Sequence, residues 1–220
     1  MTRDFPRPHA RLGILFTALT ALPARADQGA LSLDLGAGVA SLVLPAPYAS
    51  SRRGPGFAPT FLFTAGLRYA LTHHFELSVT GYYELPVTVA HTDVVLVTAT
   101  SGSFTGNLRY EVSQWGVLAG VRYVTGLVAR FFVGLEAGMS HRAYSSVQLL
   151  DPTRPGTPDY RLGLQDFATD SLVLQPLVGL EWAFADHWSA SLTARFTVLV
   201  GPEPAAGASL VLSVAYSWFL

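Results

Sequence analysis

The sequence predicts an all-β fold, an antiparallel up-and-down transmembrane β-barrel of eight strands, with ten strands as the alternative. Half of the 220 residues are apolar and only 13% are charged, whereas about 25% are charged in an ordinary soluble domain. No apolar run reaches the roughly 20 residues that a membrane-spanning helix requires. Apolar residues instead recur at every second position through many short segments, which is the period of a β-strand.

The first 26 residues have the features of a signal peptide. Arg3, Arg7 and Arg11 give a positive start, residues 12–22 form a short apolar core, and Ala24-Arg25-Ala26 fits the small-x-small cleavage rule. An uncleaved membrane anchor is the alternative, but a helix over this core spans about 16 Å, roughly half of the hydrocarbon thickness. We therefore expect Sec-type export, cleavage near Ala26 and a mature barrel domain over 27–220.

Eight segments carry the two-residue alternation and are predicted strands. In residues 75–90, for example, Phe75, Leu77 and Val79 alternate with glutamate, serine and threonine. One face of each segment is apolar, whereas the other carries mostly Gly, Ala, Ser and Thr with isolated charges. The predicted strands cover about 30–44, 59–71, 75–90, a segment ending near 123, 130–143, 170–184, 188–200 and 207–220.

The connections between these strands alternate in length. Those near 72–74, 125–129 and 185–187 are short, whereas those near 45–58, 90–106 and 144–169 are long and rich in Pro, Gly, Ser, Thr and Asp. Short turns at one end and long loops at the other are typical of bacterial outer-membrane barrels, whose long loops face outward. Segment 87–112 also has strand character. We interpret it as a hairpin rising above the membrane; a ten-stranded barrel is the alternative.

A soluble β-sandwich also alternates, so it is the chief competing fold. The outer face of a sandwich is polar and hydrated, whereas small residues suit the crowded lumen of a narrow barrel. The aromatic residues favour the barrel, because they gather near the short-turn end, as a girdle at the boundary between hydrocarbon and water would. The predicted girdle consists of Tyr69, Phe75, Tyr123, Phe131, Trp182, Phe184 and Trp188.

The last predicted strand alternates up to the final residue, with Leu210, Leu212, Val214, Tyr216, Trp218 and Leu220 on one face. It resembles the C-terminal signature by which the assembly machinery recognises outer-membrane barrels, with Tyr216, Trp218 and Leu220 as the signal. That family usually ends in Phe, so Leu220 is a departure. The whole chain is similar to the small eight-stranded OmpA-like and OmpX-like barrels of Gram-negative bacteria. The resemblance implies an outer-membrane location, insertion by the barrel assembly machinery, and contact with lipid and lipopolysaccharide.

Isolated charges on the inward faces predict an ion-pair network in the lumen. Its expected members are Asp34, Arg68, Glu76, Arg122, Glu136, Glu181 and Arg195. Their signs alternate between most neighbouring strands, which predicts the pairs Asp34–Arg68, Arg68–Glu76, Arg122–Glu136 and Glu181–Arg195. Lone charges in a narrow lumen would carry a large desolvation cost, and pairing with arginine offsets much of it. We interpret the network as a plug; the alternative is that it gates a pore.

No residue pattern predicts catalysis or a cofactor. The chain has no cysteine, which excludes disulfides and thiolate sites, and its 14 basic residues are scattered arginines, which gives no nucleic-acid footprint. The six histidines have no spacing that demands a metal. His187-Trp188-Ser189 has the His-x-Ser spacing of lipid A deacylase barrels. It falls at the short-turn end, however, with Ser189 predicted to face the lumen, so the match is weak.

These patterns predict a non-enzymatic surface barrel. A plugged lumen and three long segments, 45–58, 87–112 and 144–169, favour a role in structural support, adhesion or interaction, because loops carry specificity in such scaffolds. No motif in them names an extracellular ligand. A narrow pore for ions or small solutes and a lipid A-modifying enzyme are the alternative hypotheses.

Overall fold

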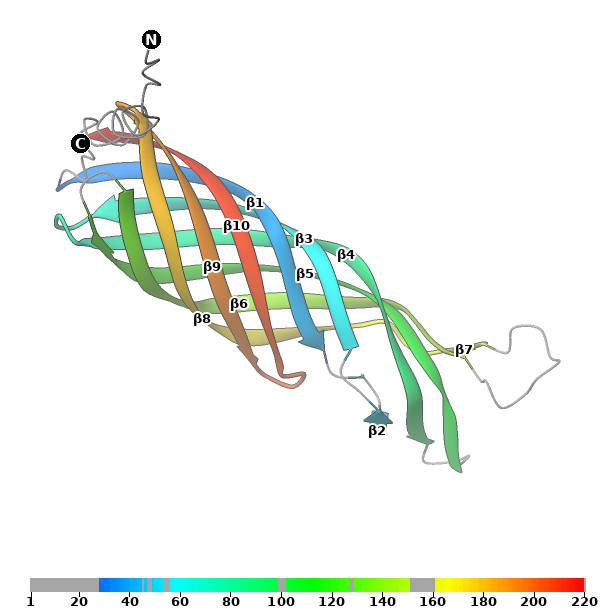
Figure 1. Cartoon of the computed structure of the whole chain (residues 1–220). Coiled ribbons are helices and arrows are strands. Elements are labelled where there is room, and N and C mark those ends of the chain that lie inside the picture. Colours follow the sequence, from blue (N-terminus) through cyan, green and yellow to red (C-terminus); the bar gives the residue numbers. More distant parts are fainter. Residues whose placement is uncertain are drawn as a thin grey trace, which may run out of the picture.

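A computed structural model describes residues 28–44, 46, 49–53, 56–98, 102–126, 129–150 and 161–219. Eight long antiparallel strands dominate these residues, and each is continuous from the short-turn end to the long-loop end (Figure 1). Two short strands, β2 (Ala49–Arg53) and β7 (Arg161–Gly163), lie at the long-loop end. The long strands are β1 (Ala30–Leu44), β3 (Gly56–Ala70), β4 (Phe75–Thr98), β5 (Gly102–Thr125), β6 (Ala129–Leu150), β8 (Phe167–Ala185), β9 (Trp188–Val200) and β10 (Ala205–Phe219).

The eight long strands close into an up-and-down barrel. Each pairs with the long strand that follows it in the chain, and the last, β10, returns to the first, β1, from Ala30↔Phe219 to Val43↔Ala206. The predicted fold class is therefore confirmed. β4 and β5 stay paired from Phe75↔Tyr123 to Thr98↔Gly102, so the predicted hairpin over 87–112 is a continuation of two barrel strands and the ten-stranded alternative is wrong.

The segments predicted as long loops contain more strand than expected. β4, β5 and β6 continue beyond the other strands as a three-stranded extension (Figure 1), and β8 begins at Phe167, inside the predicted loop 144–169. β2 pairs with the outer edge of β4 and β7 with that of β6. Pro, Gly and Ser suggested loops here, but paired neighbours satisfy the backbone whatever its composition, and the two short strands cover edges that would otherwise be open.

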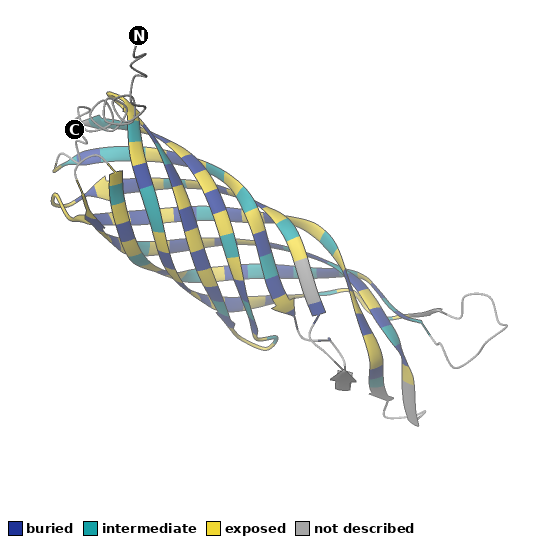
Figure 2. Ribbon diagram, in the orientation of Figure 1, coloured by how far each residue is buried: buried dark blue, intermediate teal, exposed yellow. Residues whose placement is uncertain are grey.

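Side chains along the barrel alternate between exposed and buried (Figure 2). The exposed face is mainly apolar, and the buried face is largely polar or charged. On β4 the stretch from Phe75 to Leu85 rises about 33 Å along the strand. At a tilt of about 40° it spans about 25 Å along the axis, the height of the apolar band in outer-membrane barrels. A soluble sandwich would bury these apolar residues, so that alternative is wrong. Among the described residues, no helix is both long and apolar enough to cross a membrane. On β4 the exposed set is Phe75, Leu77, Val79, Tyr83 and Leu85, and the buried set is Glu76, Ser78, Thr80, Tyr82 and Glu84.

The alternation changes phase where the strands leave the barrel. The register of β4 against β5 shifts between Glu84 and Val87, so that Val89 and His91 are buried in place of even-numbered residues. The ladder of β5 with β6 shifts at Ser146, which has φ of 53°, and Val147 and Leu149 then face inward. One inserted residue moves the following side chains to the other face.

Candidate functional site: a layered lumen

The lumen is filled by three layers of side chains. An ionic layer lies near the short turns, an apolar layer lies above it, and a polar cluster around Arg142 lies at the level where the extension begins. The apolar layer contains Leu62, Leu118, Val173, Leu199 and Val211, all at most 3% exposed. An eight-stranded barrel has room for little besides its own side chains.

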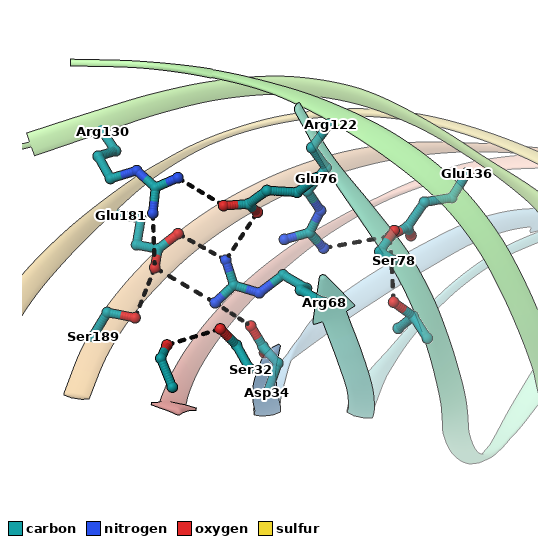
Figure 3. A network of polar contacts seen from close by, with 12 residues as sticks. Ser32, Asp34, Arg68, Glu76, Ser78, Arg122, Arg130, Glu136, Glu181 and Ser189 are labelled. Carbon is teal, nitrogen blue, oxygen red and sulfur yellow. Dashed lines mark hydrogen bonds and ion pairs between the residues drawn. The ribbon is translucent and has the colours of Figure 1, made fainter. Parts of the chain in front are cut away.

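Arg68 is the centre of the ionic layer (Figure 3). Its guanidinium lies 2.8 Å from Glu181, 3.2 Å from Asp34 and 3.4 Å from Glu76. Arg68 is on β3 and Glu181 is on β8, which are four strands apart in either direction around the barrel. Their ion pair therefore crosses the full width of the lumen. Arg130 completes this group, 2.7 Å from Glu76 and 4.0 Å from Glu181.

Glu136 is the centre of a second group in the same layer. Its side chain is fully buried and lies 3.3 Å from Arg122 and 3.9 Å from Arg195. The hydroxyls of Ser78 and Thr80 donate hydrogen bonds to Glu136 Oε1 at 3.0 and 3.3 Å. Arg195 also donates to Gln175 Oε1 at 3.4 Å. The carboxylate thus joins β4, β5, β6 and β9 across the interior.

The ionic layer is electrically balanced. Arg68, Arg122, Arg130 and Arg195 face Asp34, Glu76, Glu136 and Glu181, and each of the eight groups is within 4.0 Å of an opposite charge. Balanced pairs of this kind need no counterion from solvent, and their hydrogen bonds offset the cost of burying charge. Such an arrangement can hold the strands together and block the lumen.

Three of the four predicted ion pairs are formed, and the fourth is not. Glu181 contacts Arg68 and Arg130, whereas Arg195 contacts Glu136. In the register of β8 and β9, Glu181 is opposite Ser191 and Arg195 is opposite Leu177. Glu181 and Arg195 are therefore about 13 Å apart along the strands, so the predicted pair Glu181–Arg195 is wrong.

Arg130 and the Arg142 cluster were not predicted. Both arginines are even-numbered residues of β6, like Glu136, so the alternation that identified Glu136 also assigns them to the lumen. Arg142 donates to the Tyr144 hydroxyl at 2.8 Å, to Gln114 Oε1 at 3.3 Å and to the Glu203 carbonyl at 3.3 Å. The last of these contacts ties the connection between β9 and β10 to the interior.

The predicted girdle residues all lie on the outer face at the short-turn end. Each of the seven, from Tyr69 to Trp188, is between 36% and 60% exposed, which is the placement that a girdle requires. Tyr216 of the predicted assembly signal is also exposed and stacks edge-on with Trp188. Trp218 is half-buried, and Leu220 lies outside the described residues, as does the predicted signal peptide.

The histidine and serine of the deacylase-like spacing are not arranged for catalysis. Ser189 points into the lumen and donates to Glu181 at 2.7 Å, whereas the His187 ring lies against Tyr216. In the described part of the chain no three His, Asp or Glu side chains gather as metal ligands would.

The closed eight-stranded wall, its exposed apolar band and its polar interior define a small transmembrane β-barrel of the outer-membrane type. No protein-family model and no curated protein matches the sequence. The resemblance inferred from the sequence is nevertheless confirmed at the level of fold by solved outer-membrane barrels.

Three solved structures illustrate the likeness. The chain is similar to the outer membrane protein OprG of Pseudomonas aeruginosa, with a TM-score of 0.50 and 10% identity over 88% of this chain and 97% of that one. It is also similar to Neisserial surface protein A, with a TM-score of 0.49 and 14% identity over 86% of this chain and 99% of that one. A third similar structure is the attachment invasion locus protein Ail of Yersinia pestis, with a TM-score of 0.46 and 12% identity over 87% of this chain and 100% of that one. At such identities the shared property is the fold.

Proposed function

We propose that this protein is a non-enzymatic outer-membrane barrel whose lumen is plugged by the ionic layer and whose extracellular end serves structural, adhesion or interaction roles. The observation that carries the proposal is the ion pair of Arg68 with Glu181, 2.8 Å long, which spans the lumen between opposite walls. Solute crossing the barrel would have to separate these charges in a narrow, poorly hydrated space, where an uncompensated charge is costly.

Export and insertion form part of the same proposal. The signal features of residues 1–26 support Sec-type export with cleavage near Ala26, and the alternating C-terminal strand supports delivery to the barrel assembly machinery. The apolar band and the girdle fit contact with outer-membrane lipid and lipopolysaccharide. The short turns then face the periplasm, and the extension of β4, β5 and β6 faces outward.

The extension offers side chains rather than backbone to a partner. β2 and β7 cover its edges, so a partner strand cannot easily add to the described part of the sheet. Its outer face instead holds an open groove of about 320 Å³, lined by Thr88, Arg109, Glu111 and Gln148 among others. A groove with both charges and an amide suits a polar partner, and we assign the interaction role to this face.

Conductance in planar bilayers tests the plug. The purified barrel should show no steady openings, and a double variant Arg68→Ala/Glu181→Ala, which removes the pair across the lumen, should show them. Glu111→Gln, in the outer groove, is the control and should stay silent. Steady openings of the unmodified barrel that change in Arg68→Ala or Arg122→Ala would contradict the plug and support the pore.

Analysis of lipid A by mass spectrometry tests the proposed absence of enzymatic activity. Cells with and without the protein should give the same acyl pattern. A protein-dependent change in that pattern would overturn the non-enzymatic assignment. Permeability and adhesion, measured in the same pair of strains, would show which surface role applies.

A further inference from the structure

The barrel wall contains a seam between β3 and β4. Their ladder ends at Leu62↔Glu84, above which β3 remains paired with β1 up to Gly56 and β4 remains paired with β5. The ribbons of β3 and β4 part at this level (Figure 1). Pro59 and Pro86, one on each side, have no N–H with which to close the gap. The Thr60 hydroxyl donates to the Leu85 carbonyl across it at 2.7 Å.

The seam is bounded at both ends. Below it stands the paired ladder of β3 and β4. Above it the His91 ring of β4 lies so close to Gly56 of β3 that an added Cβ would fall 2.6 Å from the ring nitrogen Nε2. Backbone pairing between β3 and β4 is therefore missing over about residues 57–61 and 85–90. This interval lies at the outer end of the apolar band, where Tyr83 and Trp115 are exposed.

Two cavities meet at the seam from opposite sides. The outer one is an apolar groove of about 260 Å³ that includes Val39, Phe61 and Pro86. The inner one has a volume of about 10 Å³ and includes Leu42, Glu84 and Gln114. Thr60, Leu85 and Val87 line both, so a wall one residue thick separates them. The inner volume holds about one water molecule.

Glu84 differs from the other buried acids of the lumen. It is 7% exposed and lines the inner cavity, yet among the described residues no group forms a hydrogen bond or ion pair with its carboxyl group. Arg142 is near enough to interact electrostatically, but its Nε and Nη1 donate to Gln114, Tyr144 and Glu203, and its Nη2 makes no hydrogen bond to Glu84 or to any other described group. An acceptor that lacks a donor in so confined a space is costly, and Glu84 lines the cavity on the inner side of the seam.

We propose that the seam is a binding site for a small amphiphile drawn from the outer leaflet. Its alkyl body occupies the outer groove. Its head group displaces the hydrogen bond between Thr60 and Leu85, enters the inner cavity between these residues and donates a hydrogen bond to Glu84. The inner volume fixes the size of the head group, because a hydroxyl or a primary ammonium is as large as water, whereas a carboxylate or phosphate is larger and repels an ionised Glu84. The site lies above the ionic layer and does not depend on whether that layer conducts.

Photolabelling in lipid nanodiscs tests this site. Three diazirine probes with the same ten-carbon chain, an alcohol, a primary amine and a carboxylate, are compared by mass-spectrometric mapping of the labelled peptides. The alcohol and the amine should label residues 57–61 and 85–87 about tenfold more than the carboxylate, the ratio that one hydrogen bond of about 1.4 kcal/mol produces. All three should label the lipid-facing strands β9 and β10 equally.

Variants at Glu84 separate a specific site from ordinary lipid contact. Glu84→Leu should reduce seam labelling by the alcohol and the amine about tenfold and leave labelling of β9 and β10 unchanged. Glu84→Gln keeps a carbonyl acceptor, so it should retain seam labelling by the alcohol and weaken seam labelling by the amine. This variant also provides the test if Glu84→Leu does not fold. Equal seam labelling by all three probes, or labelling unchanged in both variants, would mean that ordinary lipid fills the groove.

Discussion

The lower part of the barrel and the extension above it differ in which side chains face outward. From the short turns to Glu84, apolar side chains face outward, and most of the buried inward side chains outside the apolar layer are polar or charged. In the extension the inward side chains are apolar, as with Val94, Leu108 and Val147, whereas Thr92, Thr105 and Arg109 are exposed. The surrounding solvent explains the difference, because hydrocarbon favours an apolar exterior and water favours an apolar core. The register shifts at Glu84 and Ser146 occur at the level where the exposed face changes from apolar to polar.

The largest effect is expected in the lower interior. Arg68→Met leaves Asp34, Glu76 and Glu181 without their shared cation, and breaking a buried pair by removing one partner costs about 3–5 kcal/mol. The free energy of unfolding, measured by denaturant titration in lipid vesicles, should fall by that amount. Arg109→Met, on the exposed face of the extension, is the matched control, expected within about 0.5 kcal/mol. Equal losses in the two variants would mean that the lower interior is as well hydrated as the outside.

A smaller effect is expected from steric crowding at the upper end of the lumen. Gly116 faces inward, and a Cβ placed there would lie 2.6 Å from the Tyr82 ring. Gly116→Val should therefore lower the free energy of unfolding by about 1–3 kcal/mol, the usual cost of overpacking. Gly81 faces outward on the neighbouring strand, and a Cβ placed there would come no closer than 3.7 Å to its nearest neighbour, the Ala65 carbonyl oxygen. Gly81→Val should change stability little, and a loss equal to that of Gly116→Val would contradict the assignment of faces.

The same division separates the features that the sequence predicts well from those that it does not. Alternation predicted the wall and seven of the eight charges of the ionic layer, because lipid outside and a narrow lumen inside impose one choice at each position. Arg130 was missed although its place on β6 obeys the same rule. The hairpin over 87–112 was also predicted, since its strand character does not depend on which face is buried.

Two features could not be predicted from the sequence. The partner of Glu181 depends on strand register and on contacts across the lumen, and Arg68 is 113 residues away on the opposite wall. The seam lies beside the bulge of β4 between Glu84 and Val87, and an inserted residue looks no different in sequence from its paired neighbours. Pro59 and Pro86 were the available signal, because proline is confined to edges and bulges of sheets, but each also suits a loop.

The smallest effect concerns the level along the barrel at which the surroundings of the wall change from hydrocarbon to water. His141 Nδ1 and Asp170 Oδ1 lie 2.8 Å apart on the outer face, with side chains 37% and 67% exposed, beside the Trp115 ring. If water surrounds this pair, Asp170→Asn should cost less than about 1 kcal/mol, and the loss should shrink further at high salt because screening weakens exposed pairs. Denaturant titration at low and high salt measures both. A loss above about 2 kcal/mol that salt does not change would place the pair in a low-dielectric environment. The hydrocarbon would then reach above Trp115, and the seam would lie within the bilayer instead of at its outer edge.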